Sequence, residues 1–241
     1  MPHALRRYFD YKLNRANYLT HISRRYHAVF LEVPKAGCTV VKRVLQVAED
    51  PAAADVATVH DRASSPLAGP LRDGFDADEL FGPSSDWFTF TFVRNPYSRA
   101  LSCYLEKVAG LQRLSDMRLP KLGLEPGRDV SFREFLELLA SDRDVRDADI
   151  HWTPQATLLS LDRVSYDFIG RFESFAPDLE RMLARLGIEG DPELVQRRTT
   201  HETGAGSRLQ EHYDDACADL VRSIYAEDFE RLGYGRDARM A

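Results

Sequence analysis

Two stretches of the chain are almost wholly apolar, and polar residues and then an amphipathic stretch follow each of them. The first reads Ala-Val-Phe-Leu-Glu-Val at 28–33, and the second reads Trp-Phe-Thr-Phe-Thr-Phe-Val at 87–93. Short runs rich in β-branched and aromatic residues are typical of buried strands. Apolar residues at helical spacing follow both runs. With a further core strand over 166–172, the pattern predicts an α/β fold with a mostly parallel sheet and helices on both faces.

The remaining pattern predicts helices and loops around this sheet. Residues 1–27 are basic, with Leu5 and Phe9 at helical spacing, and predict an amphipathic helix. Residues 50–85 and 110–129 are expected to be irregular connections. Further helices are expected from the capping box at Ser131, over 178–186 before Gly187, and over about 207–231. The whole of 1–241 is expected to form one domain.

Composition excludes several classes of protein. The chain has 241 residues, 44% of them hydrophobic and 29% charged, as in ordinary globular proteins. A net charge of −6 argues against a nucleic-acid binder. Three scattered cysteines fit neither a disulfide framework nor a zinc site, and no metal is expected. No apolar run approaches the roughly 20 residues that span a bilayer.

The loop after the first strand has the composition of a phosphate cradle. It reads Pro-Lys-Ala-Gly-Cys-Thr at 34–39, and a helix is expected to begin directly after it. Helix N-termini present unpaired N–H groups and the positive end of the helix dipole, and Lys35 adds a charge beside Gly37. The nucleoside-triphosphate motif needs its lysine directly before a hydroxyl residue, and here Lys35 precedes Ala36. The loop therefore predicts an anion site of another kind.

The loop after the second strand predicts a second phosphate site. Asn95 is a good N-cap and Pro96 suits the first helical position, so a helix is expected to begin there. Ser98 and Ser102 then share one helix face, near the point where Arg94 leaves the strand. An arginine with hydroxyl groups beside it suits a phosphate monoester.

These two loops, in this order and about fifty residues apart, resemble the carbohydrate sulfotransferases, which use 3′-phosphoadenosine 5′-phosphosulfate (PAPS). The resemblance covers roughly 26–234 and implies a three-layer, P-loop-NTPase-like sulfotransferase fold. In that family the first loop holds the 5′-phosphosulfate, and the matching Arg and Ser of the second hold the 3′-phosphate. Further segments extend the likeness: Val59-His60, His151-Trp-Thr-Pro-Gln155, Tyr166 to Glu173, and Ile224 to Tyr234.

The resemblance implies roles for single residues. The 5′-phosphosulfate would be bound by Lys35, Ala36, Gly37, Cys38, Thr39 and Val40, and the 3′-phosphate by Arg94 and Ser102. A basic residue near the C-terminus also assists the 3′-phosphate in the family, and Arg197, Arg198 and Arg208 are the candidates here. We interpret Cys38 as a provider of its backbone N–H, because it lacks the arginine spacing of a cysteine phosphatase loop.

Sulfuryl transfer to an alcohol needs a base for the hydroxyl proton, and imidazole suits that role near neutral pH. His60, between the two phosphate loops, is the predicted base, and an ordinary loop histidine is the alternative. Lys35 is expected to neutralise charge on the leaving phosphate. His151 is the reserve candidate for the base. His151 and Trp152 are expected either to contact the acceptor sugar or, in the case of Trp152, to close the core.

The sequence thus predicts a PAPS-dependent O-sulfotransferase that acts on a carbohydrate or carbohydrate-like hydroxyl and uses no metal. A kinase-type phosphotransferase and a non-catalytic nucleotide-binding module are the alternatives. Animal members of the family usually carry an N-terminal membrane anchor, which we do not find here, so a cytoplasmic, bacterial enzyme is expected. The basic residues 1–27 leave peripheral membrane contact open.

Overall fold

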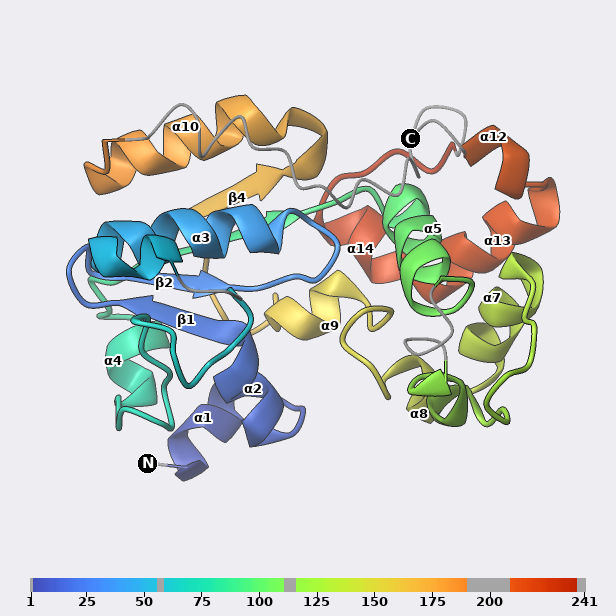
Figure 1. The fold of residues 1–241 in the computed structure, drawn as a ribbon, viewed down its shortest axis with the longest axis horizontal. Coiled ribbons are helices and arrows are strands. Elements are labelled where there is room, and N and C mark those ends of the chain that lie inside the picture. The colour runs from blue at the N-terminus through green and yellow to red at the C-terminus, as the bar shows by residue number, and fades with distance from the viewer. Residues whose placement is uncertain (1, 56–58, 111–115, 190–208, 238–241) are drawn as a thin grey trace. The chain divides into compact units, whose positions relative to one another are not determined.

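The computed structural model describes residues 2–55, 59–110, 116–189 and 209–237. Its contacts divide the chain into two compact units (Figure 1). Unit 1 comprises Met1–Val93 and Leu159–Thr200, and unit 2 comprises Arg94–Leu158 and His201–Ala241. Each unit has a hydrophobic core of its own, and each is described separately below.

Unit 1 is built on a four-stranded sheet of order β1-β2-β3-β4. Strands β2 and β3 pair in parallel with Ala28 opposite Phe88, and β3 and β4 pair in parallel with Phe90 opposite Phe168. Strand β1 pairs antiparallel with β2. The predicted α/β class with a mostly parallel sheet is therefore confirmed. The strands are β1 (Thr20–Ser23), β2 (Ala28–Leu31), β3 (Phe88–Val93) and β4 (Phe168–Arg171).

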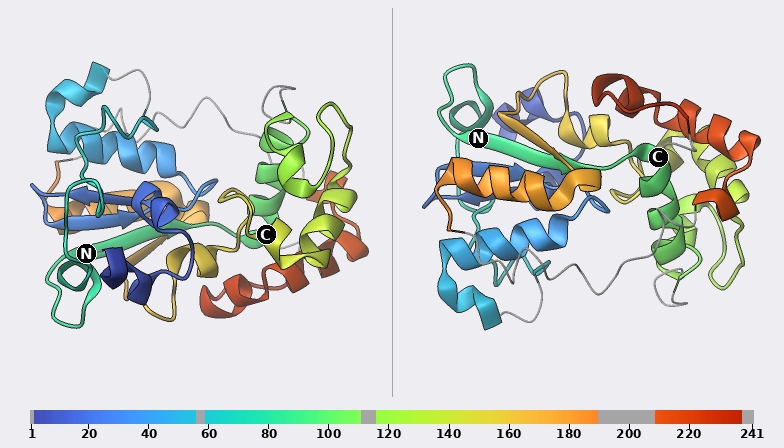
Figure 2. Two further views of the ribbon diagram at one scale, coloured as in Figure 1. Left: turned by 90° about the horizontal axis from the view of Figure 1, so that it is seen from below. Right: turned by 90° about the horizontal axis from the view of Figure 1, so that it is seen from above.

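Helices α3 (Cys38–Glu49) and α10 (Phe175–Leu186) pack on one face of the sheet. The rings of Phe30, Phe90 and Phe92 meet the apolar faces of these two helices. The short helices α1 (Pro2–Tyr8) and α2 (Leu13–Leu19) lie on the side opposite α3 (Figure 2). Because helices cover both faces of the sheet, nearly all side chains of its parallel strands β2 and β3 are buried. The sequences of these two strands are therefore continuous apolar runs.

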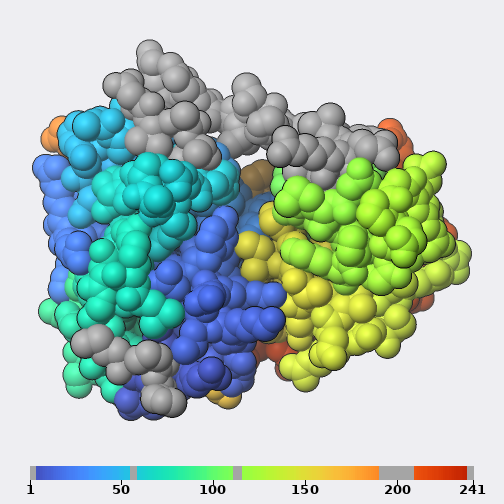
Figure 3. Space-filling view, turned by 60° about the horizontal axis from the view of Figure 1, so that its bottom comes forward, coloured from blue at the N-terminus to red at the C-terminus, as the bar shows by residue number. Residues whose placement is uncertain are grey.

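The N-terminal segment differs from the single helix that its sequence predicts. It forms two helices of one to two turns and then enters β1, in which every residue is buried. Pairing with β2 gives hydrogen-bond partners to the buried backbone N–H and C=O groups of β1. A short helix is only marginally stable by itself, so this pairing outweighs the helical spacing of the apolar residues. In Figure 3, the described N-terminal residues, in blue, and the described residues before β3, in cyan to green, lie side by side on the face of unit 1 that is turned to the viewer.

That connection is largely irregular, as the sequence predicts. Its described part contains the 3-10 turn η1 (Pro51–Asp55) and helix α4 (Ala77–Phe81). Asp76 caps α4 by accepting the backbone N–H of Asp78, and Arg7 of α1 pairs with Asp78 at 2.8 Å. Another 3-10 turn, η3 (Phe172–Ser174), joins β4 to α10.

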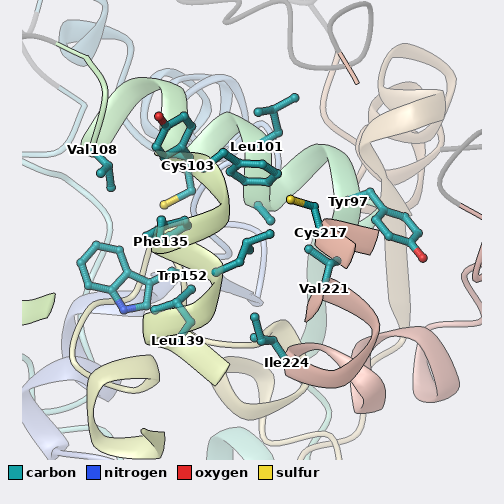
Figure 4. Packing of buried hydrophobic residues seen from close by; sticks show 14 of the residues in the cluster. Tyr97, Leu101, Cys103, Val108, Phe135, Leu139, Trp152, Cys217, Val221 and Ile224 are labelled. Atoms are coloured by element: carbon teal, nitrogen blue, oxygen red, sulfur yellow. The ribbon is translucent and has the colours of Figure 1, made fainter. Parts of the chain in front are cut away.

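Unit 2 is helical around a core that contains Leu101, Phe135, Trp152 and Val221 (Figure 4). The predicted helix starts at Asn95 and Ser131 are confirmed, since each of these side chains caps a helix. The predicted last helix over 207–231 is wrong, because Asp214 starts a new helix by accepting the N–H of Cys217. The elements are α5 (Pro96–Lys107), η2 (Leu119–Leu122), α7 (Phe132–Ser141), α8 (Arg143–Arg146), α9 (Gln155–Leu159, whose last residue belongs to unit 1), α12 (Leu209–His212), α13 (Asp215–Ile224) and α14 (Ala226–Arg231).

Among the described residues, no helix has the length and apolar character needed to cross a membrane.

Candidate active site

The loop between β2 and α3 has the shape of an anion cradle. Lys35 and Gly37 have φ of 73° and 83°, in the left-handed region, and Gly37 is the N-cap of α3. A Cβ at Gly37 would lie 2.3 Å from Cε2 of Phe175. Left-handed residues beside right-handed ones turn successive N–H groups toward one side, which makes an anion-binding concavity. Glycine is required at 37 both for its backbone and for its lack of a side chain.

The first turn of α3 adds unpaired donors to this cradle. No side chain caps the helix, and within the described residues the backbone N–H groups of Cys38 and Thr39 have no hydrogen-bond partner. The N–H of Val40 is bonded to the Gly37 carbonyl at 3.1 Å. The helix dipole places positive charge at the same end, close in sequence to Lys35. This segment can bind a phosphate or sulfate group.

A buried chain of polar side chains runs beside the cradle. Lys42 Nζ donates to Glu32 Oε2 at 2.8 Å, and it also lies 2.8 Å from Nδ1 of His60. The other ring nitrogen of His60, Nε2, lies 3.3 Å from Thr39 Oγ1. Lys42 and Glu32 are 1% and 3% exposed, whereas His60 is exposed. The predicted site residues Thr39 and His60 are therefore brought together, and Lys42, which the sequence did not single out, connects them to Glu32.

His21 completes the chain behind Glu32. Its Nε2 lies 2.9 Å from Glu32 Oε2, and Arg62 donates to its Nδ1. Burial lowers the pKa of His21 to about 4, although the hydrogen bond with Glu32 opposes the shift, so the ring is neutral at pH 7. Burial alone would raise the pKa of Glu32, but the His21 hydrogen bond and the Lys42 charge outweigh it and hold that pKa well below its ordinary value. Glu32 is therefore a buried carboxylate.

Cys38 lies near the same charges. Burial, followed by the charge of Glu32, raises the pKa of the Cys38 thiol to about 12. A nucleophilic cysteine needs a lowered pKa. This agrees with the interpretation of Cys38 as a small residue whose backbone N–H serves the anion.

Unit 2 carries the second predicted loop. Arg94 is buried; its Nε donates to Ser98 Oγ at 3.1 Å, and its backbone N–H donates to Gln155 Oε1 at 2.9 Å. Ser102 is buried on α5, one helical turn beyond Ser98. The structure thus adds Ser98, in contact with Arg94 Nε, to the hydroxyl groups of this loop. Both hydroxyls lie on the α5 face that the sequence predicts.

Several residues that hold this loop were missed by sequence reasoning. Arg99 donates to the carbonyls of Ile150 and Thr153, which joins the 150–153 segment to α5. Asp228 accepts the backbone N–H groups of Gln155 and Ala156 at 2.9 and 2.7 Å. These contacts join segments 51 to 73 residues apart, and the sequence signal for them is their presence in the family-like motifs.

His151 is held by a carboxylate. Its Nδ1 is hydrogen-bonded to Asp149, which also pairs with Lys121 and Arg118. Burial lowers the pKa of His151, with Asp149 opposing the shift. No hydrogen-bond partner of His151 Nε2 lies in the part of the chain that the structure describes. An imidazole held in this way keeps a lone pair on Nε2, as a general base requires.

Trp152 has no exposed surface, and its Nε1 donates to the Val145 carbonyl at 2.9 Å. The ring packs in a T-shaped contact against Phe135 in the core of unit 2. The sequence left two roles open for Trp152, and in the structure its side chain is part of the core of unit 2.

The candidates Arg197, Arg198 and Arg208 lie outside the described residues. Among the residues that are described, no group of three or more His, Cys, Asp or Glu side chains is placed to hold a metal ion.

Comparison with known proteins identifies the family. The Sulfotransferase family model matches residues 19–235. Carbohydrate sulfotransferase 8 of Homo sapiens is 30% identical over 98% of this chain and 61% of its own length, and that of Mus musculus is 28% identical over 98% and 62%. Carbohydrate sulfotransferase 14 of Homo sapiens is 28% identical over 91% and 61%. No solved structure matches.

The chain therefore spans about three fifths of the length of the relatives it matches, at 61% and 62%. The family model, in contrast, covers most of the chain and includes both loops that the sequence predicts to bind phosphate. This chain belongs to the Sulfotransferase family.

Proposed function

We propose that this chain transfers the sulfuryl group of PAPS to a hydroxyl of a carbohydrate or carbohydrate-like acceptor and releases adenosine 3′,5′-bisphosphate. The observation that carries the proposal is the cradle at 35–40, with its left-handed Lys35 and Gly37 and the open first turn of α3. The relatives that the chain matches are named carbohydrate sulfotransferases, which supports a carbohydrate acceptor. This chain spans only part of the length of these relatives, so its activity as a whole protein is likewise a proposal.

Unit 1 would hold the 5′-phosphosulfate. The cofactor supplies a sulfuryl group attached to a phosphate that can leave. Of residues 36–40, the backbone N–H groups of Cys38 and Thr39 would meet the anionic oxygens together with the Lys35 ammonium, and Lys35 would act most strongly as negative charge grows on the leaving phosphate. Preorganised donors of this kind stabilise a transition state because they need no reorientation as charge develops.

Unit 2 would hold the 3′-phosphate through Arg94, Ser98 and Ser102. The guanidinium is already fixed by Ser98, so little side-chain entropy is lost when an anion binds. Arg197, Arg198 and Arg208 remain candidates for a second cation at this phosphate.

A histidine would accept the proton of the acceptor hydroxyl. The sequence favours His60, which lies beside Thr39 of the cradle, with His151 in reserve. The hydrogen bonds of the two rings differ, since His60 Nδ1 faces the Lys42 ammonium and His151 Nδ1 faces the Asp149 carboxylate. Both assignments are proposals that variant kinetics can separate.

The phosphotransferase alternative is less well supported. Such an enzyme would place a magnesium-binding hydroxyl residue directly after the loop lysine, and Ala36 occupies that position. A non-catalytic module would share the binding residues and differ only in turnover. Cytoplasmic location and peripheral membrane contact through residues 1–27 stay predictions.

The test is a turnover assay that follows release of adenosine 3′,5′-bisphosphate from PAPS over a panel of sugar acceptors. Acceptor-dependent release is expected. Thermal unfolding with adenosine 3′,5′-bisphosphate or with ATP and magnesium separates the alternatives, because a ligand stabilises in proportion to its occupancy of the native state. Stronger stabilisation by ATP with magnesium would favour the phosphotransferase, and bisphosphate binding without turnover on any acceptor would favour the non-catalytic module.

A further inference from the structure

Lys42 lies between a buried carboxylate and the exposed ring of His60. Its Nζ is 2.8 Å from Glu32 Oε2 and 2.8 Å from His60 Nδ1, and its side chain is 1% exposed. Glu32 also accepts a hydrogen bond from His21, which is itself held by Arg62. A charged pair this deeply buried is costly unless every member is hydrogen-bonded. The chain Arg62–His21–Glu32–Lys42 meets that condition and ends on His60.

The chemistry of an ammonium decides which nitrogen of His60 carries the proton. Lys42 forms a buried ion pair with Glu32 at 2.8 Å. An ammonium has three donors and no acceptor. The His60 Nδ1 that it contacts must therefore present a lone pair, so the proton of the neutral ring is on Nε2. That N–H is directed to Thr39 Oγ1, at 3.3 Å.

We propose that Lys42 is a positioning residue that holds His60 as an N–H donor to Thr39. When the Thr39 oxygen accepts this hydrogen bond, its own hydroxyl proton is available to an anion in the cradle. Thr39 is the second residue of α3, where a ligand would meet the first-turn donors. The inference rests on the proposed function only for the identity of that anion.

The proposal has a consequence for the choice between the two histidines. While Lys42 occupies Nδ1, Nε2 of His60 has no lone pair and cannot accept the acceptor proton. His151 is held in the opposite form, with Nδ1 directed to the Asp149 carboxylate. His60 therefore has a donor role in place of the base role that the sequence favours, and of the two candidates His151 is the one that keeps on Nε2 the lone pair that a base requires.

The first test is nitrogen NMR of the free protein labelled at histidine, with His60→Gln to assign the signal. Neutral His60 is expected in the Nε2–H form. In Lys42→Met the ring is expected to become a mixture of both forms, and Lys12→Met, the same change at an exposed lysine, should leave it unaltered. Finding the Nδ1–H form in the unaltered protein would overturn the proposal, and this result needs no folded Lys42 variant.

The second test is kinetic. Lys42→Met and His60→Ala are each expected to weaken adenosine 3′,5′-bisphosphate binding about five- to tenfold, the loss of one oriented hydrogen bond. Below neutral pH the turnover of unaltered enzyme should fall as the base is protonated; His60→Ala should keep this decline and His151→Ala should lose it. Loss of the decline in His60→Ala would return the base to His60. If PAPS turnover is absent throughout, the proposed function fails, while the NMR result still judges Lys42.

Discussion

Lys35 and Lys42 are expected to have different roles because they lie in different surroundings. Lys35 lies in the cradle with a left-handed backbone, whereas Lys42 lies one turn into α3 with its charge matched by buried Glu32. A cation already paired in the interior contributes little extra attraction to a ligand, because its field is largely cancelled by its partner. Lys35, which lies in the cradle itself, is the expected cation of the phosphosulfate site.

We predict that Lys35→Ala lowers turnover more than affinity. Its charge matters most as the leaving phosphate gains charge, so its loss is felt in the transition state more than in the bound state. Loss of a preorganised donor of this kind typically costs about 100-fold in rate. Isothermal titration with adenosine 3′,5′-bisphosphate and steady-state kinetics measure the two effects, and an equal loss in both would contradict the assigned role.

For Arg94→Ala we expect the opposite balance. Removing one partner of a charge-assisted contact should weaken adenosine 3′,5′-bisphosphate binding by about 2 to 4 kcal/mol. Adenosine 5′-phosphate, which lacks the 3′-phosphate, serves as the control ligand in the same titration. Its affinity should change little, and a parallel loss for both ligands would show that Arg94 does not read the 3′-phosphate.

At the scale of elements, the fold places a loop at the end of each parallel strand. Strand β2 leads to the cradle and helix α3, and β3 leads to Arg94 and helix α5. Ligands of open parallel sheets bind beyond the carboxyl ends of the strands. The cradle depends on contact between elements, because Phe175 of α10 closes on Gly37.

Gly37→Ala is expected to destabilise the protein by more than the roughly 1 to 2 kcal/mol of a left-handed alanine. The added methyl would lie 2.3 Å from the Phe175 ring, so the ring or the loop must also move. Gly187→Ala is the matched control, since φ there is 65° and nothing lies within 4 Å of its Cβ. Urea unfolding measures the free energy of unfolding of both variants. Equal losses would mean that the Phe175 ring moves aside at no energetic cost.

At the scale of the whole molecule, buried titratable groups couple stability to pH. The folded-state pKa of His21 is about 4, below its ordinary 6.5. A histidine whose pKa is lowered on folding contributes stability that is complete above its unfolded value and is lost as pH falls toward the folded value. Glu32, with a lowered carboxyl pKa, contributes stability that is lost at still lower pH.

We therefore predict that the free energy of unfolding falls by up to about 3 kcal/mol between pH 6.5 and 4 because of His21. Urea titrations across this range measure the fall, and His21→Gln, whose side chain does not titrate, should flatten it. His151, whose pKa is also lowered, remains in both proteins and does not affect the difference. An unchanged slope in His21→Gln would show that His21 is not neutral and buried in solution.

The amino-acid sequence by itself determined the elements whose signals are local. The apolar runs at 28–33 and 87–93, the caps at Asn95 and Ser131, and the stop at Gly187 all appear in the structure where the pattern predicts them. The reason is that capping, φ preference and strand burial depend on residues within a few positions. Order and spacing of the two loops were enough to indicate the family.

Only the tertiary structure decided the contacts between distant segments. Strand β1 replaced part of a predicted helix because β2 offered it a partner, and Trp152 entered the core rather than a sugar site. His60 and His151 have opposite tautomers because their Nδ1 atoms have different partners. Lys42, 18 residues away in the sequence, contacts Nδ1 of His60, and Asp149 contacts Nδ1 of His151. The sequence shows a histidine at both positions, and the group that the fold places beside Nδ1 decides which ring nitrogen carries the proton.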